Sequence, residues 1–288
     1  MAIPKRLMGQ AGRYSLVDGI PFQLPVKCEK SPALFAVFSI NADKAASLIP
    51  GNEVHPFRIW NKGLLVISVM DYRITSIGKY IEFSIAIACT HGPKQAPRLL
   101  PAIFMKHFGT GQFVCDLPVC SEISVKGGKG IWGMPKHQAN LNYVVTETTV
   151  SSQYDLDGEL VMKIELERPP NAWFPLSVGA ANYCQFRGML MKSYIYFQGK
   201  LGFFLFRKGS AKLTIGTHPR IQPLKELEIS PDPILTAFIP EANGLLDDYC
   251  ESWFLSYETP PSVRPEGMES VVNLGLGQEW LGPPTRRP

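Results

Sequence analysis

The chain has 288 residues, of which 45% are hydrophobic and 19% are charged. This length and balance exclude a disordered chain, a collagen and a coiled coil, and they allow one sizeable hydrophobic core. The formal net charge is +4 and the basic residues are dispersed, so the composition does not indicate nucleic-acid binding. The 11% of aromatic residues, with 25 glycines and 25 prolines, favours a strand-rich fold with many turns.

Neither a membrane span nor a disulfide framework is predicted. No segment reaches the roughly 18 apolar residues that a membrane helix requires, and no apolar stretch of secretory length follows Lys5 and Arg6. We therefore expect a soluble, cytoplasmic protein. The six cysteines lack a CxxC pair and several lie in apolar segments, which favours buried free thiols over disulfides.

The N-terminal region is expected to be an arm that leads into the body of the protein. Residues 1–30 contain three prolines and predict an irregular N-terminal arm. A compact apolar strand follows over 33–40. Asn41 is then typical of a helix N-cap, and Pro50 is expected to end the short helix that follows.

Two strands are predicted over 64–72 and 82–89, and we expect them to pair across the loop between them. The second strand alternates between an apolar face and a face that begins with Glu82. Residues 90–114 then form a Pro- and Gly-rich insertion, within which 99–108 are compatible with a helix. The histidines and Lys106 of this insertion belong either to a lid or pocket wall or to an exposed loop.

The middle of the chain predicts a strand, a turn and a hairpin. Residues 119–125 resemble a strand, and the glycine-rich stretch 126–130 predicts a turn after it. Further strands over 140–150 and 159–166 flank the sequence Asp-Leu-Asp-Gly at 155–158, which is typical of a hairpin turn.

The last third predicts a mixture of short elements. A helix is expected over 182–192 and a second, short helix over 231–238. The remaining strands are predicted over 194–197, 203–206, 212–215 and 252–257. Prolines are frequent in 258–288, which predicts an extended or mobile tail. The sequence thus predicts one domain, 31–257, between the arm and the tail.

The stretch Gly-Ile-Trp-Gly-Met-Pro-Lys-His that ends at His137 is the strongest chemical signal. Pro135 stiffens the backbone, so Lys136 is presented beside the apolar Trp132 and Met134. Desolvation disfavours an ammonium there, and an imidazolium at His137 would disfavour it further, which leaves an amine able to attack a carbonyl. The alternative is a surface lysine after a turn proline.

Three segments carry a resemblance to a known family. The sequence Gly-Lys-Tyr-Ile-Glu-Phe at 78–83, then Trp-Gly-Met-Pro-Lys at 132–136, then the stretch 231–249 with Ile-Pro at 239–240, resemble the acetoacetate decarboxylase superfamily. The match in pattern covers about 31–257. It implies a mostly β (α+β) fold, an antiparallel conical β-barrel with a few peripheral helices. It also implies a homo-oligomer.

The resemblance assigns roles by position. Lys136 matches the lysine that forms the Schiff base, Glu82 matches the glutamate of the Tyr-x-Glu string, and His137 stands where the family has a second lysine. The candidate site therefore comprises catalytic Lys136, Glu82 and His137 and substrate-binding Tyr80, Trp132 and Met134. Without the resemblance, a solvated strand edge is the favoured interpretation of Glu82. In an extended segment His137 faces away from Lys136 and acts through its field or structurally.

Two further polar residues of the decarboxylases, an arginine and a glutamate, fall near Phe35 and Ile67. Loss of the arginine removes the obvious partner for the carboxylate of a β-keto acid, which argues against simple acetoacetate decarboxylation. An amine and one carboxylate in an apolar pocket still suffice for iminium and enamine chemistry.

The sequence therefore indicates a lyase that acts on a keto acid, aldehyde or ketone through a lysine Schiff base, of the decarboxylase or aldolase-dehydratase type. The alternatives are a biosynthetic cyclase, isomerase or hydratase that uses the same pocket without a Schiff base, and a non-catalytic barrel that binds an apolar ligand. The expected partner is a small-molecule substrate. No cofactor or metal is expected, because the five histidines show no ligand spacing.

Overall fold

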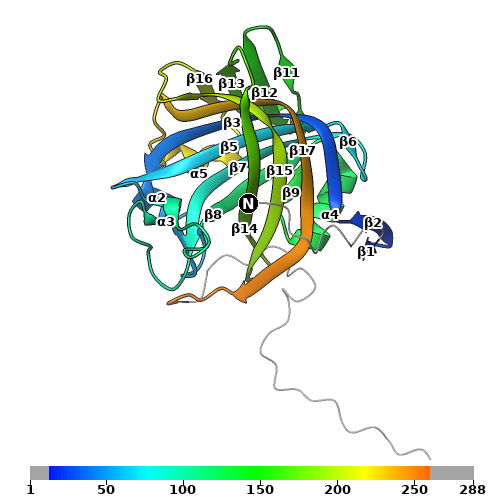
Figure 1. The fold of residues 1–288 in the computed structure, drawn as a ribbon. Coiled ribbons are helices and arrows are strands. Elements are labelled where there is room, and N and C mark those ends of the chain that lie inside the picture. The colour runs from blue at the N-terminus through cyan, green and yellow to red at the C-terminus, as the bar shows by residue number, and fades with distance from the viewer. Residues whose placement is uncertain (1–12, 260–288) are drawn as a thin grey trace, which may run out of the picture.

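The computed structural model describes residues 13–259. Strands dominate it, and the helices are few and peripheral (Figure 1), so the expected mostly β fold is confirmed. No helix among residues 13–259 is long and apolar enough to span a membrane.

Seven of the described strands close a barrel. They follow one another in the order β7-β5-β3-β17-β15-β14-β8, and β8 also pairs with β7, which completes the ring. All neighbours are antiparallel except β8 and β14, which are parallel. The barrel strands are β3 (Val26–Asn41), β5 (Lys62–Tyr72), β7 (Tyr80–His91), β8 (Gly111–Val119), β14 (Phe174–Phe186), β15 (Met189–Leu205) and β17 (Pro233–Phe254).

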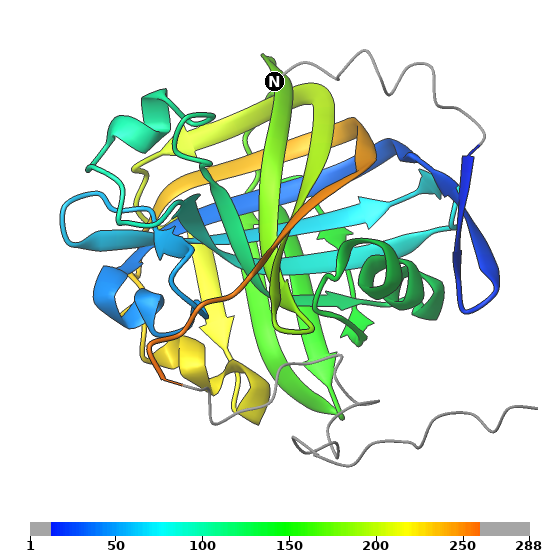
Figure 2. The same cartoon turned by 90° about the horizontal axis from the view of Figure 1, so that it is seen from below.

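Smaller elements surround the barrel (Figures 1 and 2). A second sheet consists of β10 (Asn140–Leu141), β11 (Val144–Val145), β12 (Thr149–Leu156), β13 (Glu159–Glu167) and β16 (Ala211–Ile215). Short strands are β1 (Arg13–Val17), β2 (Ile20–Leu24), β4 (Val54–Pro56), β6 (Ile74–Thr75) and β9 (Lys136–Gln138). The helices are α2 (Ala42–Ala46), α3 (Leu100–Ile103), α4 (Glu122–Trp132), the 3-10 turn η1 (Pro219–Ile221) and α5 (Gln222–Lys225).

The period-two pattern of β7 decides which residues face the inside of the barrel. Phe83, Ile85 and Ile87 are fully buried in a core that also includes residues of the second sheet, so they face outward from the barrel and are covered. Glu82 and Ser84 lie on the opposite face and line a cavity inside the barrel. The predicted pairing of this strand with β5 is confirmed, with Ser84 opposite Ser68.

Local turn and cap chemistry is also confirmed at two places. The Asn41 side chain caps α2 by accepting hydrogen bonds from the backbone N–H groups of Asp43 (3.0 Å) and Lys44 (3.2 Å). The hairpin between β12 and β13 turns at Asp157 and Gly158, both with positive φ (53° and 81°).

The predicted glycine turn over 126–130 is wrong, and so is the predicted strand beyond Val119, because Val119 ends β8 and Glu122–Trp132 form α4. The glycines, which are poor helix formers, occur here because neighbours approach the helix closely. A Cβ on Gly127 would lie 2.6 Å from Phe22, one on Gly128 would lie 2.3 Å from Lys136 Cδ, and Gly130 is similarly close to the N-terminal hairpin. Packing has overridden local propensity.

Both helices predicted in the last third are wrong as well. Residues 182–192 belong to β14 and β15, which are joined by a tight turn in which Arg187 and Gly188 have positive φ (52° and 73°). Residues 231–238 begin β17, a long strand that is paired on both sides with β3 and β15. This pairing on two edges outweighs the helix signals of Asp232 and Pro240.

The two ends of the chain and the cysteines can also be compared with the predictions. Of the expected irregular arm, the described part is ordered: β1 and β2 form a hairpin that packs on α4, and β3 begins at Val26. The expected tail from 260 onward lies outside the described residues. All six cysteines lie within the described residues and are free thiols, and three of them are fully buried.

Candidate active site

The backbone that presents Lys136 is a helix end followed by a short strand. Gly133 ends α4 in the left-handed region (φ 66°), where its N–H donates to the carbonyl of Lys129 (3.0 Å). After Pro135 the chain enters β9, which pairs in parallel with β8 and sets Lys136 opposite Leu117. Both the helix cap and the strand register therefore fix the Lys136 side chain.

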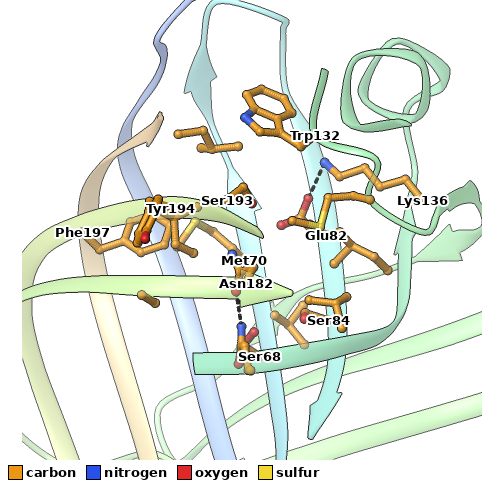
Figure 3. Close-up of a pocket in the computed structure, with 18 of the residues that line it drawn as sticks. Ser68, Met70, Glu82, Ser84, Trp132, Lys136, Asn182, Ser193, Tyr194 and Phe197 are labelled. Atoms are coloured by element: carbon orange, nitrogen blue, oxygen red, sulfur yellow. Dashed lines mark hydrogen bonds and ion pairs between the residues drawn. The ribbon is translucent and has the colours of Figure 1, made fainter. Parts of the chain in front are cut away.

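The Lys136 side chain ends in a buried ion pair (Figure 3). Only 4% of it is exposed, and Nζ lies 2.6 Å from Glu82 Oε2. The ammonium also donates a hydrogen bond to Ser124 Oγ (3.0 Å) and lies 5.4 Å from the centre of the Tyr80 ring. Glu82 Oε2 receives no hydrogen bond of good geometry from the described residues, so its contact with Lys136 is mainly electrostatic.

Two stacked tyrosines complete the surroundings of Glu82. The rings of Tyr72 and Tyr80 are 4.5 Å apart, and the Tyr72 hydroxyl donates to Glu82 Oε1 at 3.4 Å. Burial, followed by the negative charge of Glu82, raises the pKa of both phenols well above the usual value. Both tyrosines therefore remain neutral hydrogen-bond donors near the carboxylate.

The ion pair opens into a cavity of about 210 Å³ inside the barrel. Its apolar wall includes Phe35, Trp132, Met134, Val178, Ile195 and Phe197. The Trp132 indole N–H is already bound to the backbone carbonyl of Asp247 (2.6 Å), so this side chain offers the cavity its ring only. Lys136 and Glu82 are the only charged side chains that line the cavity among the described residues.

The structure gathers most of the predicted site. Lys136, Glu82, Trp132 and Met134 line the cavity, as the sequence analysis expected of a common pocket. Tyr80 does not line it, and lies beneath the Lys136 ammonium. At the two positions where the resemblance suggested lost polar groups, Phe35 lines the cavity, and Ile67 is buried in the outer core.

The structure places His137 outside this cavity, on the face away from Lys136 that the sequence analysis expects of an extended segment. Its Nε2 lies 2.9 Å from Asp116 Oδ1 and 3.2 Å from the Tyr154 hydroxyl. Asp116 also pairs with Arg220 (2.8 Å). Burial alone would raise the pKa of Asp116, but the hydrogen bonds from His137 and Arg220 hold it below the usual value. The physical reason is strand alternation, which turns consecutive side chains to opposite faces.

The residues singled out in the 90–114 insertion do not belong to the main cavity. Neither His91, Lys106 nor His107 lines the main cavity. Lys106 lines a separate cavity of about 250 Å³ elsewhere. Among residues 13–259, no three His, Cys, Asp or Glu side chains are grouped as metal ligands.

Several residues of the site were missed by sequence reasoning. Ser124 was assigned to a strand, and its contact with Lys136 becomes visible only once α4 is recognised as a helix. Tyr72 was seen only as the end of a strand. Asn182 was placed in a helix, whereas it lies on β14 and lines the cavity. No local signal identifies these residues, because three different elements bring them together.

The sequence of the chain was also compared with known protein families and curated proteins. The sequence matches the acetoacetate decarboxylase (ADC) family over residues 10–242. No curated protein sequence matches the chain.

Solved structures show the same fold. An acetoacetate decarboxylase from Legionella pneumophila is similar with a TM-score of 0.59 and 14% identity, over 80% of this chain and 87% of that one. The enduracididine biosynthesis enzyme MppR with HEPES buffer bound gives 0.57 and 12%, over 82% and 89%. MppR complexed with the condensation product of pyruvate and imidazole 4-carboxaldehyde gives 0.55 and 12%, over 79% and 88%.

Proposed function

The chain belongs to the acetoacetate decarboxylase family, and from this premise we propose that it is a lyase acting on a ketone, aldehyde or keto acid through a Schiff base on Lys136. One observation carries the proposal: the Lys136 amine is buried at the wall of an apolar cavity, with one carboxylate, Glu82, at 2.6 Å. An amine that is to become covalently bound needs a proton acceptor at hydrogen-bond distance. In acetoacetate decarboxylase itself, lysine acts as such a nucleophile.

The ion pair provides the proton transfer that the first step requires. Transfer of one proton from Lys136 to Glu82 produces an amine and a carboxylic acid, and a low-dielectric cavity favours this loss of two charges. The amine then attacks the carbonyl carbon and one of its protons passes to the carbonyl oxygen, Glu82 returns its own proton to the resulting hydroxyl, and water departs. The resulting iminium carries the positive charge that the ammonium carried, so Glu82 balances it without any rearrangement of charge.

The iminium withdraws electrons from the bond beside it. Loss of a proton or of a carbon substituent from the neighbouring carbon gives an enamine, and Glu82 is placed to accept and return the proton. The Ser124 hydroxyl and the Tyr72 hydroxyl hold the two partners in position through their hydrogen bonds. This sequence of steps is common to aldol cleavage, dehydration and decarboxylation.

The cavity lining favours the aldolase-dehydratase type. By the resemblance, the arginine of the decarboxylases falls near Phe35, which lines the cavity, and no arginine lines the cavity among the described residues. A substrate carboxylate would therefore meet no cation other than Lys136, which Glu82 already neutralises. The condensation product named for MppR supports the same class of chemistry.

A second candidate function is favoured by the contact of Tyr72 with Glu82. A phenol and a carboxylate at 3.4 Å could act as acid and base in a cyclase, isomerase or hydratase in which Lys136 remains an ammonium. The two candidates differ in whether the amine itself is essential.

Exchange of the α-protons of heptan-2-one in D₂O, followed by NMR, tests the proposal without knowledge of the natural substrate. We expect exchange with the natural protein, none with Lys136→Arg, and a strong reduction with Glu82→Gln, because a guanidinium stays protonated and forms no iminium. Lys129→Ala, on the same helix end but outside the cavity lining, is the control and should exchange normally. Exchange that survives Lys136→Arg but not Glu82→Gln would favour the second candidate.

The assembly, location and domain boundaries of the chain are proposals that rest on the sequence. We propose a homo-oligomer, which the exposed Trp173, Phe206 and Phe254 support, and sedimentation at micromolar concentration tests it. We also propose a cytoplasmic location, and one barrel domain over 31–257 flanked by an arm and a tail. Limited proteolysis tests these boundaries.

A further inference from the structure

Beyond the ion pair, uncharged polar side chains line the cavity, of which Ser68, Ser84, Asn182 and Ser193 are labelled in Figure 3, and the strand pairings arrange them in two rows. Ser68 on β5 and Ser84 on β7 are direct cross-strand partners. Gln112 on β8, Asn182 on β14 and Ser193 on β15 form the second row, since Asn182 pairs with Gln112 on one side and with Ser193 on the other. All five side chains line the cavity, so five strands direct polar groups into one space.

Three of these side chains are buried, whereas Ser68 and Gln112 are partly buried at the cavity wall. The exposed fractions of Ser84, Asn182 and Ser193 are 7%, 6% and 3%. Gln112 Nε2 donates a hydrogen bond to Asn182 Oδ1 (2.8 Å), and both side chains line the cavity. No described residue forms a hydrogen bond with the hydroxyls of Ser68, Ser84 or Ser193.

A buried polar group without a partner is costly, so this arrangement is stable only if the cavity contents supply hydrogen bonds. Water can do so in the absence of a ligand, and a ligand must replace those bonds if it is to displace the water without loss of affinity. The group that fits has both donor and acceptor capacity, because the rows offer hydroxyls, an amide NH₂ and an amide carbonyl. It is uncharged, because neither row contains a charged residue.

The spacing along β7 gives the distance between the two ends of the ligand. Ser84 follows Glu82 by two positions on the same face of the strand, which corresponds to about 7 Å. A carbonyl carbon at Lys136 is therefore separated from the polar rows by a chain of several atoms, which the apolar wall would cover. We propose that this cavity selects an uncharged carbonyl compound with a hydroxyl or amide group at its far end, bound by Ser68, Ser84, Asn182 and Ser193. The placement of the ligand's carbonyl group at Lys136 rests on the proposed function, whereas the placement of its hydroxyl or amide group among the polar rows does not.

Calorimetric titration with three matched ketones tests the proposal. The ligands are heptan-2-one, 7-hydroxyheptan-2-one and 6-oxoheptanoate, which differ only in whether the far end is apolar, hydroxylated or anionic. We expect the hydroxyketone to bind about tenfold more tightly than heptan-2-one, because its hydroxyl group would form roughly two neutral hydrogen bonds with the cavity wall. The oxoacid should bind most weakly. Equal binding of the first two ligands, tightest binding of the oxoacid, or no binding of the hydroxyketone would each overturn the proposal.

Serine-to-alanine variants test whether the polar rows cause the preference for the hydroxyketone over heptan-2-one. The double variant Ser84→Ala/Ser193→Ala should bind the hydroxyketone no better than heptan-2-one. Ser151→Ala, on β12 and away from the cavity, is the matched control and should keep the preference. A preference that persists in the double variant contradicts the assignment. If the double variant does not fold, as judged by circular dichroism, the three-ligand comparison on the natural protein decides alone.

The same samples separate this inference from the proposed function. A preference for the hydroxyketone without α-proton exchange supports the polar subsite and refutes the Schiff base. Exchange without the preference refutes the subsite and leaves the Schiff base standing.

Discussion

Gly128 is the residue at which stability and activity are expected to separate. It lies in α4, where alanine is more favourable than glycine by about 0.8–1.0 kcal/mol. A Cβ at this position would lie 2.3 Å from Cδ and 2.8 Å from Cε of Lys136. Carbon atoms prefer separations of roughly 3.5–4.0 Å, so Gly128→Ala must push the lysine stem aside by about 1 Å or more.

The displacement should cost activity much more than folding. Overpacking costs typically 1–3 kcal/mol, and the gain in helix propensity offsets part of it, so the melting temperature should fall only modestly. A misplacement of about 1 Å in a reacting group can cost on the order of 100-fold in rate. We therefore expect α-proton exchange of heptan-2-one to slow about 100-fold in Gly128→Ala.

Gly130→Ala provides the matched control for this prediction. It is on the same helix and gains the same propensity, but its Cβ would meet Val17 of the N-terminal hairpin instead of Lys136. Exchange should therefore remain near the natural rate. If Gly128→Ala exchanges as fast as Gly130→Ala, the position of the lysine stem does not control the reaction and the reasoning fails.

Three further predictions concern stability, the proton network and thiol chemistry. Asp116→Asn should lower the free energy of unfolding by roughly 3 kcal/mol in urea titrations, because it leaves the paired imidazole and guanidinium without their carboxylate. The pKa of Asp116 is lower in the folded than in the unfolded state, so the carboxylate stabilises the fold above about pH 4, and this stabilisation is lost as the pH falls through the folded-state pKa. Thermal unfolding at decreasing pH should show this loss in the natural protein and not in Asp116→Asn. Ser124→Ala should reduce the exchange rate about 3- to 10-fold with little change in melting temperature, since one hydrogen bond to Lys136 is lost; an unchanged rate would remove Ser124 from the site. Brief treatment with iodoacetamide should modify the exposed Cys120 before the other cysteines, as detected by mass spectrometry of the peptides. Cys28 should react slowly, because burial raises the pKa of its thiol to about 12. Faster labelling of Cys28 than of Cys120 would contradict its burial.

The parts of the fold that follow from local chemistry were predictable. The Asn41 cap uses its own side chain, and the Asp157-Gly158 turn uses the positive φ that these two residues tolerate. The alternation in β7 also placed Glu82 and Ser84 on one face, which the cavity confirms. In each case the deciding residues are near in sequence.

The parts that depend on distant neighbours were not predictable. Gly127 and Gly128 signalled a turn, yet the helix accepts them because Phe22 and Lys136 occupy the space that a Cβ would need. The resemblance found Lys136 and Glu82, which lie in the strings that carry it, but the polar rows arise from strands that only the closed barrel brings together. Asn182 is an example, since its role depends on Gln112 across the parallel pair β8–β14.

The central claim is that the Lys136 amine bonds covalently to a carbonyl carbon, and reductive trapping measures this directly. Incubation with heptan-2-one and cyanoborohydride, followed by peptide mass spectrometry, should add the mass of the ketone less one oxygen atom to the peptide that contains Lys136. The account predicts this adduct at Lys136, and its absence from Lys136→Arg. An adduct confined to other lysines, or turnover of the ketone with no adduct at Lys136, would contradict the account.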